Sequence, residues 1–75
     1  MEWNEILRAL REDKEPKPTQ TDVAKACHIT QRKLSFIETG TTEPSMQDLK
    51  ELCRYYNVSA DYILGLPEGL PYPKH

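Results

Sequence analysis

The sequence has few of the features that mark membrane, secreted or disulfide-rich proteins. It contains no apolar run near the roughly 20 residues that a membrane-spanning helix needs. No basic segment followed by an apolar one resembles a secretory leader. Two cysteines, Cys27 and Cys53, make no disulfide framework, and both are predicted to act as small apolar groups in a core. These absences predict a cytoplasmic protein that does not bind a membrane.

Motifs for catalysis and for cofactor binding are also missing. The three glycines do not form a phosphate-binding loop. A metal site could be built from Cys27, His28 and Cys53, but no CxxC spacing exists, and adjacent Cys27 and His28 leave a helix end in different directions. A core cysteine beside an exposed histidine explains this pattern better. We therefore expect no enzyme activity, no metal, no cofactor and no small-molecule ligand.

The chain also lacks the basic composition that is typical of nucleic-acid binders, since its net charge is -2. The charge is unevenly distributed, however. Residues 14–33 carry five basic and two acidic side chains, a local charge of +3, whereas residues 1–13 sum to -2 and residues 34–75 to -3. Positive charge is therefore concentrated in the middle of the chain. On its own, so small an imbalance is better explained by solvated surface side chains.

The sequence that remains is helical in character, with no strand-like alternation. Apolar residues at three- and four-residue spacing predict a helix over residues 1–13, with Trp3 as a lid on the core. Pro16 and Pro18 stop that helix, because each proline restricts the residue before it to extended geometry. Thr19 and Asp22 have the form of a capping box, which predicts a second helix that begins at residue 20 and ends near residue 28.

Further capping signals predict three more helices. Thr30 suits the N-cap of a helix over about residues 30–39, and Gly40 follows where a left-handed residue is wanted. Ser45 with Asp48 resembles another capping box and begins a fourth helix; a short fifth helix follows near residue 60. The fourth helix is predicted to bury one stripe of side chains: Met46, Leu49, Leu52, Cys53 and Tyr56.

The outward side of the third predicted helix suits the edges of DNA bases. Arg32 and Lys33 lie in its first turn, where the helix dipole makes a cation cost ~0.3–1 kcal/mol, so an external anion is suspected. The alternative is two ordinary surface side chains. Gln31 can pair with adenine and Arg32 with guanine. Phe36 could press on a thymine methyl group, or be a partly buried rim residue with about equal weight, and Ser35 could bond a base or a phosphate.

The segment TQTDVAKACHITQRKLSFIETG, followed by EPS, resembles the helix-turn-helix of the phage repressor and Cro family, also called the Xre type. The resemblance continues through LKELCRYYNVSADYILG. It implies an all-α, compact five-helix bundle of the lambda-repressor-like DNA-binding type, whose second and third helices form the helix-turn-helix. We expect this domain to span residues 1–66, with a proline-rich tail over residues 67–75. The residues that match at family spacing are Gln20, Ala24, Ile29, Ser35, Ile37, Glu38, Gly40 and Pro44.

The resemblance further implies a sequence-specific transcriptional regulator, expected to be a repressor that binds a palindromic operator in double-stranded DNA as a homodimer. Its base-contacting residues would be Gln31, Arg32, Ser35 and Phe36. Its phosphate-contacting residues would be Gln20, Lys33, Thr39, Thr41 and Thr42. Arg11 and Glu38 match a structural ion pair with no catalytic role. The dimer contact is expected through Tyr62, Leu66 and Leu70.

Three departures from the family pattern leave a second interpretation open. His28 stands where glycine is usual, the first loop is about two residues longer, and Thr41-Thr42-Glu43 replaces the usual basic loop after the third helix. The neutral loop should weaken phosphate binding. The alternative is a protein-interaction module, an antitoxin or adaptor, that keeps the fold with weak or no DNA affinity. Acidic net charge favours this alternative, and Arg32 and Lys33 argue against it.

Overall fold

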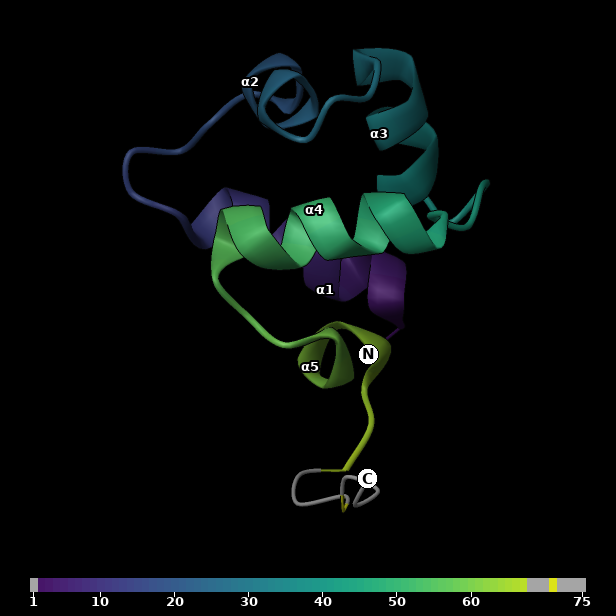
Figure 1. Cartoon of the computed structure of the whole chain (residues 1–75). Coiled ribbons are helices and arrows are strands. Elements are labelled where there is room, and N and C mark those ends of the chain that lie inside the picture. The colour runs from purple at the N-terminus through teal and green to yellow at the C-terminus, as the bar shows by residue number, and fades with distance from the viewer. Residues whose placement is uncertain (1, 68–70, 72–75) are drawn as a thin grey trace.

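The computed structural model describes residues 2–67 and residue 71. In Figure 1 the second and third helices form the upper part of the molecule, the first and fourth cross its middle, and the fifth lies below. No strand occurs in the described residues, so the expected all-α class is confirmed. None of the helices described is both long and apolar enough to cross a membrane. The helices are α1 (Trp3–Asp13), α2 (Gln20–Ala26), α3 (Gln31–Glu38), α4 (Met46–Tyr56) and α5 (Ala60–Leu64).

Reciprocal capping boxes begin α2 and α4. The Thr19 hydroxyl accepts the Asp22 amide N–H at 3.1 Å, and the Asp22 carboxylate accepts the Thr19 N–H at 3.1 Å. Ser45 and Asp48 exchange the same two bonds at 3.1 and 3.0 Å. Each box satisfies two N–H groups that a helix start leaves without partners, and each acid lies where the helix dipole favours it. Both predicted boxes are therefore confirmed.

Residues in left-handed conformation end the helices and set the turns. His28, with φ of 62°, adopts the left-handed conformation at the position where the family turn usually has glycine. Histidine enters this conformation more often than most residues do. Asn57, with φ of 55°, ends α4 in the same way. Gly40 follows α3 with φ of 79°, and a Cβ atom there would lie 3.2 Å from the Asn4 side chain. Glycine is thus favoured by the left-handed backbone, and any larger residue would also require the Asn4 side chain to shift slightly.

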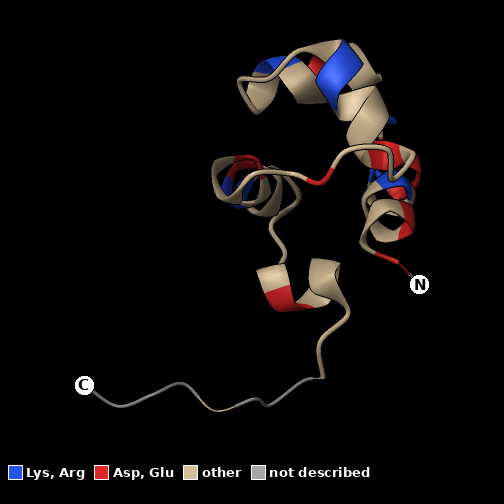
Figure 2. Cartoon of the chain, turned by 90° about the vertical axis from the view of Figure 1, so that its right-hand side faces the viewer, with Lys and Arg blue, Asp and Glu red and all other residues tan. Residues whose placement is uncertain are grey.

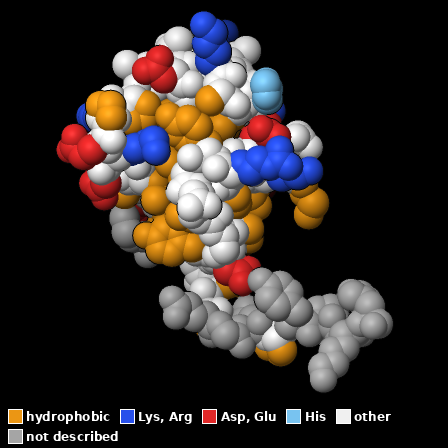
Figure 3. Space-filling model, turned by 60° about the vertical axis from the view of Figure 1, so that its left-hand side comes forward, with side chains coloured by type: hydrophobic (Ala, Val, Ile, Leu, Met, Phe, Trp, Pro, Cys, Tyr) orange, Lys and Arg blue, Asp and Glu red, His pale blue; other side chains and the backbone are white. Residues whose placement is uncertain are grey.

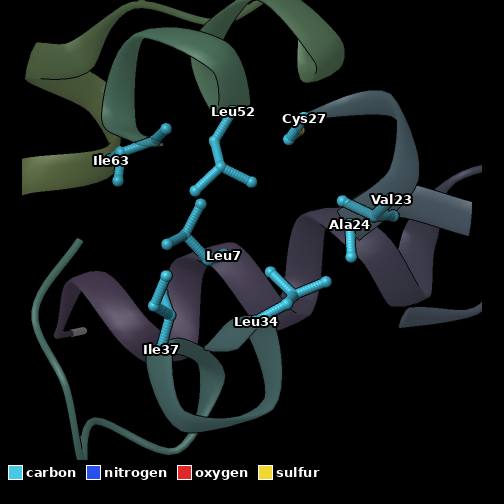
Figure 4. Close-up of a cluster of buried hydrophobic side chains, with 8 residues drawn as sticks. All are labelled: Leu7, Val23, Ala24, Cys27, Leu34, Ile37, Leu52 and Ile63. Atoms are coloured by element: carbon cyan, nitrogen blue, oxygen red, sulfur yellow. The ribbon is translucent and has the colours of Figure 1, made fainter. Parts of the chain in front are cut away.

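One hydrophobic cluster holds the five helices together and fixes how α3 is presented. Figure 4 shows its side chains pointing toward one another from every helix. Leu34 and Ile37, three residues apart, bury the inward side of α3 at 1% and 0% exposure. Burial of such a side chain contributes about 1.5–3 kcal/mol, so the rotation of α3 about its axis is strongly determined. The cluster consists of Leu7, Val23, Ala24, Cys27, Leu34, Ile37, Leu52 and Ile63.

The predicted buried stripe of α4 is wrong at one end. Leu52 is fully buried, and Leu49, Cys53 and Tyr56 pack against the core. Met46, in contrast, is 90% exposed. It has the spacing of the stripe but is the first residue of α4, and the rest of the described chain leaves it uncovered. Spacing along one helix predicts a face but not how far along that face the neighbouring helices reach.

Candidate nucleic-acid interface

The outward side of α3 is exposed, apart from one contact with the Gln20 side chain of α2. Gln31 and Arg32 are exposed, Phe36 is 39% exposed, and Ser35 is half-buried between them. Figure 1 places α3 at the edge of the molecule, next to α2 and away from α5. The four predicted base-reading side chains therefore share one accessible surface, which a double helix can approach.

A chain of hydrogen bonds connects this surface to the interior. Glu38, 2% exposed, accepts a bond from Gln20 Nε2 at 3.0 Å. Gln20 Oε1 in turn accepts a bond from Gln31 Nε2 at 2.8 Å. Because an ionised carboxylate only accepts, Gln20 must turn its NH₂ group inward and its oxygen toward Gln31. Gln31 is then left with one free N–H and its carbonyl oxygen, the donor and acceptor that adenine requires. Sequence reasoning assigned Gln20 only to DNA contacts and missed this bridging role.

The carboxylate at the end of that chain belongs to an ion pair that joins α1 to α3. Arg11 Nε lies 2.9 Å from Glu38 Oε2, and Arg11 Nη2 donates to Glu38 Oε1 at 3.1 Å. The two side chains are 12% and 1% exposed. The hydrogen bond to Glu38 raises the pKa of Arg11 in spite of its burial. Arg11 Nη1 also donates to the Pro18 carbonyl at 3.4 Å. The pair therefore fixes the C-terminal end of α3 against α1 and the start of α2.

Tyr56 has a hydroxyl group that is buried without a hydrogen-bond partner among the described residues. Burial raises the pKa of this phenol, and the Glu38 charge acts in the same direction. An unsatisfied buried hydroxyl costs about 1–3 kcal/mol. We expect Tyr56→Phe to raise the free energy of unfolding by about 1 kcal/mol. Urea denaturation measures this, with Tyr55→Phe as the matched control that brings no gain; a clear loss of stability in Tyr56→Phe would contradict the assignment.

The two cations in the first turn of α3 have different surroundings. Lys33 Nζ lies 2.8 Å from Asp48 Oδ2, and the Asp48 side chain is 6% exposed. The protein itself thus supplies an anion for Lys33, so this residue no longer requires an external one. Arg32 has no acidic partner in the described part of the chain, and its guanidinium lies over the Phe36 ring, 5.5 Å from the ring centroid. The charge that remains free on the outward side is that of Arg32.

The Lys33–Asp48 pair predicts a specific acid sensitivity. Burial alone would raise the pKa of Asp48, but the Lys33 ammonium and the hydrogen bonds from Ser45 outweigh it and lower the pKa. A lowered pKa gives stability that is complete above the ordinary aspartate pKa near ~3.9 and is lost as the pH falls through the lowered value. Asp48→Asn should therefore cost about 1 kcal/mol at pH 7 and lose stability less steeply than the parent below pH ~4.

Denaturation midpoints between pH 7 and pH 2 test this acid sensitivity. Asp22→Asn is the matched control. Asp22 has the same capping geometry and a pKa lowered mainly by the Thr19 hydrogen bonds, and it forms no ion pair with a lysine, although the Lys25 charge also lowers its pKa. Parallel pH profiles for the parent and Asp48→Asn would show that Lys33 contributes nothing through this carboxylate.

The threonines after α3 are largely engaged with the end of that helix. The Thr39 hydroxyl donates toward the Ser35 and Phe36 carbonyls, each at 3.1 Å. Its oxygen lies 3.0 Å from the Thr41 hydroxyl. The backbone N–H groups of Thr41 and Thr42 both donate to the Phe36 carbonyl, at 2.9 and 3.2 Å. A hydroxyl has one hydrogen to donate, and that of Thr39 goes to the carbonyls, so the Thr41 hydroxyl must donate to Thr39. The exposed Thr42 hydroxyl is then the free donor that this loop offers to a phosphate.

Charge is distributed unequally over the molecule. In Figure 2, lysine and arginine colour the top of the view, where α2 and α3 lie, and acidic residues colour parts of α5 and the loop before α4. The face drawn in Figure 3 shows basic and acidic side chains around a central band of hydrophobic ones. Of the five basic residues between positions 14 and 33, Lys25, Arg32 and Lys33 lie on α2 and α3, whereas Lys14 and Lys17 lie in the loop before α2. The two helices of the candidate interface are therefore more basic than the chain as a whole.

No metal site is formed by the residues that the structure describes. No group of three or more His, Cys, Asp or Glu side chains among them could hold an ion. Cys27 is buried, and burial raises the pKa of its thiol to about 11, whereas His28 beside it is exposed. Cys53 is half-buried, and both cysteines are free thiols. The two cysteines thus behave as core residues.

Two residues expected at a dimer contact, Tyr62 and Leu66, lie in or just after α5, at the end of the molecule away from α3 (Figure 1). Tyr62 is 57% exposed and Leu66 is 44% exposed. Leu70 lies outside the described residues. Leu64, 48% exposed, was not foreseen, and with Trp3 and others it lines a hollow of about 200 Å³. An apolar surface is therefore present at this end.

Comparison with known proteins decides what this fold is. The sequence model of the helix-turn-helix family matches residues 7–63, about three-quarters of the chain. The chain belongs to the Xre, or lambda-repressor-like, helix-turn-helix family. Proteins of this family are DNA-binding transcription regulators, and the chain is one by this membership, which points to no enzymatic role.

Solved structures agree with the family assignment. The c2 repressor of phage P22, solved in complex with the synthetic operator 9T in the presence of Tl⁺, is 28% identical and superimposes with a TM-score of 0.78. The match covers 85% of this chain and 94% of that one. The SOS-response transcriptional repressor LexA from Eubacterium rectale, 18% identical, shares the fold with a TM-score of 0.78, over 97% of this chain and 76% of that one. A search of curated protein sequences gives no significant match.

Proposed function

We propose that this helix-turn-helix protein is a transcriptional repressor that reads a palindromic operator in double-stranded DNA as a homodimer. The observation that carries the proposal is the outward side of α3. There Gln31 is held by Gln20 with a donor and an acceptor free, and Arg32 is exposed without an acidic partner in the described chain. Side chains of these two types make the bidentate contacts that distinguish adenine and guanine in the major groove.

The repressor of phage P22 supports this proposal, because it was solved on operator DNA and its fold is shared along most of both chains. In the proposed complex, the four outward residues of α3 face the bases and a second group contacts phosphates. Lys33 would reach phosphate only by sharing or leaving its bond to Asp48. We place the binding unit in residues 1–66 and leave residues 67–75 as a tail. The proposed phosphate contacts are Gln20, Lys33, Thr39, Thr41 and Thr42. Of these, Thr39 and Thr41 would first have to release the hydrogen bonds that their hydroxyls donate at the end of α3.

Selection of bound duplexes from a random pool tests the function directly. We expect a two-fold symmetric consensus with half-sites about 34 Å apart, one turn of DNA. Titration of that duplex by fluorescence anisotropy should show affinity that falls as salt rises, with a shallow slope because the loop after α3 carries no lysine or arginine. Absence of any selected sequence and of salt-dependent binding would favour the protein-interaction module instead, which the acidic net charge permits.

The dimer surface is proposed around Tyr62 and Leu66, with Leu70 as a further candidate. A charge on Leu66 would be buried unpaired in such a contact, which is strongly unfavourable. We expect Leu66→Asp to shift the protein toward monomer in sedimentation at micromolar concentration. Met46→Asp, which changes another exposed apolar residue, is the control and should leave the mass unchanged. Equal masses for the parent and Leu66→Asp would remove this surface from the interface.

A further inference from the structure

The Arg32 guanidinium and the Phe36 ring lie together on the outward side of α3, four residues apart. The guanidinium carbon is 5.5 Å from the ring centroid, within the range of a cation–π contact. Arg32 makes no hydrogen bond or ion pair among the described residues, so the ring is its one specific partner there. The pair therefore offers a role for Phe36 that differs from direct contact with a base.

The backbone of Phe36 is firmly placed. Its carbonyl accepts hydrogen bonds from the Thr41 and Thr42 N–H groups and from the Thr39 hydroxyl, at 2.9, 3.2 and 3.1 Å. The residue is also partly covered, since 39% of it is exposed. A phenylalanine side chain has only two rotatable bonds, whereas arginine is long and loses much rotamer entropy when it is ordered. The Phe36 ring thus restricts the Arg32 side chain, which would otherwise sample many rotamers.

Stacking on a ring occupies the flat face of the guanidinium and leaves its N–H edge free. That edge is the part of arginine that pairs with O6 and N7 of guanine. In the first turn of α3 the helix dipole disfavours a cation, and the negative face of the ring offsets part of this cost. The contact also strengthens when the major groove excludes water, because cation–π energy rises on desolvation.

We propose that Phe36 is a positioning residue that acts on DNA through Arg32, and that the pair selects a guanine at one operator position. This proposal rests on the proposed function of α3. It adds that Arg32 contacts the base and that Phe36 holds Arg32 in position. It differs from the expectation that Phe36 presses on a thymine methyl group. In that case Phe36 would contribute independently of Arg32 and would depend on thymine.

A double-mutant cycle separates these two roles. The probe is the duplex that the parent protein selects from a random pool, measured by fluorescence anisotropy. Phe36→Leu should weaken binding about 2- to 30-fold when Arg32 is present. In the Arg32→Ala background the same change should have almost no effect. Phe36→Tyr keeps the aromatic face and should retain most of the affinity, and Met46→Leu is the control for an exposed apolar change elsewhere.

Modified bases and the free protein supply two independent readouts. Replacing the preferred guanine with 7-deazaguanine removes the N7 acceptor and should abolish the effect of Phe36→Leu, whereas deoxyuridine in place of thymine should leave that effect intact. In NMR spectra of the free protein, ring-current shifts of the Arg32 side-chain protons should disappear in Phe36→Leu and persist in Phe36→Tyr. Thermal unfolding followed by circular dichroism checks that each variant is folded.

Each outcome is informative. Additive effects of Arg32→Ala and Phe36→Leu, or loss of the Phe36 effect on deoxyuridine DNA, would overturn the positioning role and leave the proposed function standing. Failure to select any duplex would overturn the proposed function and this inference with it.

Discussion

Replacing Glu38 with alanine is expected to lower the free energy of unfolding by about 3–5 kcal/mol. The Glu38 carboxylate is buried and accepts bonds from Arg11 Nε and Nη2 and from Gln20 Nε2. Its removal leaves a partly buried guanidinium with only the Pro18 carbonyl as a partner and the Gln20 amide without its acceptor, which costs more than the pair contributes. A domain of this length has a total stability of only about 4–11 kcal/mol. Glu38→Ala should therefore be close to unfolding at 37 °C.

Urea denaturation at 10 to 25 °C measures this loss. The matched control is the double variant Arg11→Met with Glu38→Leu, which removes both charges and fills their space with apolar atoms. We expect it to recover much of the stability that the single variant loses. If Glu38→Ala loses less than about 1 kcal/mol, the ion pair is solvated in solution and does not fix α3.

Replacing Arg32 with alanine is expected to cost about 1–3 kcal/mol of binding free energy at the selected operator, or roughly 5- to 150-fold in affinity. The loss should be confined to one base position, where the preference for guanine disappears, because Arg32 is exposed and contributes nothing to the core. Unfolding stability should stay within about 0.5 kcal/mol of the parent.

Anisotropy titrations against the selected duplex and a random duplex check this prediction. Arg54→Ala is the matched control: it also removes one exposed arginine, whose side chain is 69% exposed, but from α4. It should change both affinities slightly and equally. If Arg32→Ala binds both duplexes as the parent does, base reading by this residue is excluded.

The local signals in the sequence were sufficient for the helices. The capping boxes at Thr19 and Ser45 and the left-handed residue Gly40 are confirmed by the hydrogen bonds and backbone angles. Each depends on contacts within three or four residues, which the sequence displays directly. His28 adopts a left-handed conformation where the family turn usually has glycine, because the turn geometry demands it whatever the side chain.

Contacts between distant residues were not accessible in the same way. Lys33 was interpreted as a cation awaiting an external anion, yet Asp48, fifteen positions away, lies 2.8 Å from it. The sequence predicts Asp48 as part of the capping box of α4, and no sequence pattern indicates that the same carboxylate also pairs with Lys33. Met46 failed for a related reason, since its exposure depends on where other helices end. The Arg11–Glu38 pair was foreseen only through the family resemblance, not from spacing.

The amide of Gln20 has a consequence for how such a protein can evolve. One side chain serves both the folding of the domain and the orientation of Gln31, so a substitution selected for a new operator at residue 20 would also disturb the carboxylate beneath it. Residues 32 and 36 are not constrained by the fold in this way, because they are exposed and their side chains make no hydrogen bond to the interior among the described residues. New binding preferences in this lineage should therefore arise first at those two positions, with residue 20 held constant by the requirements of the fold.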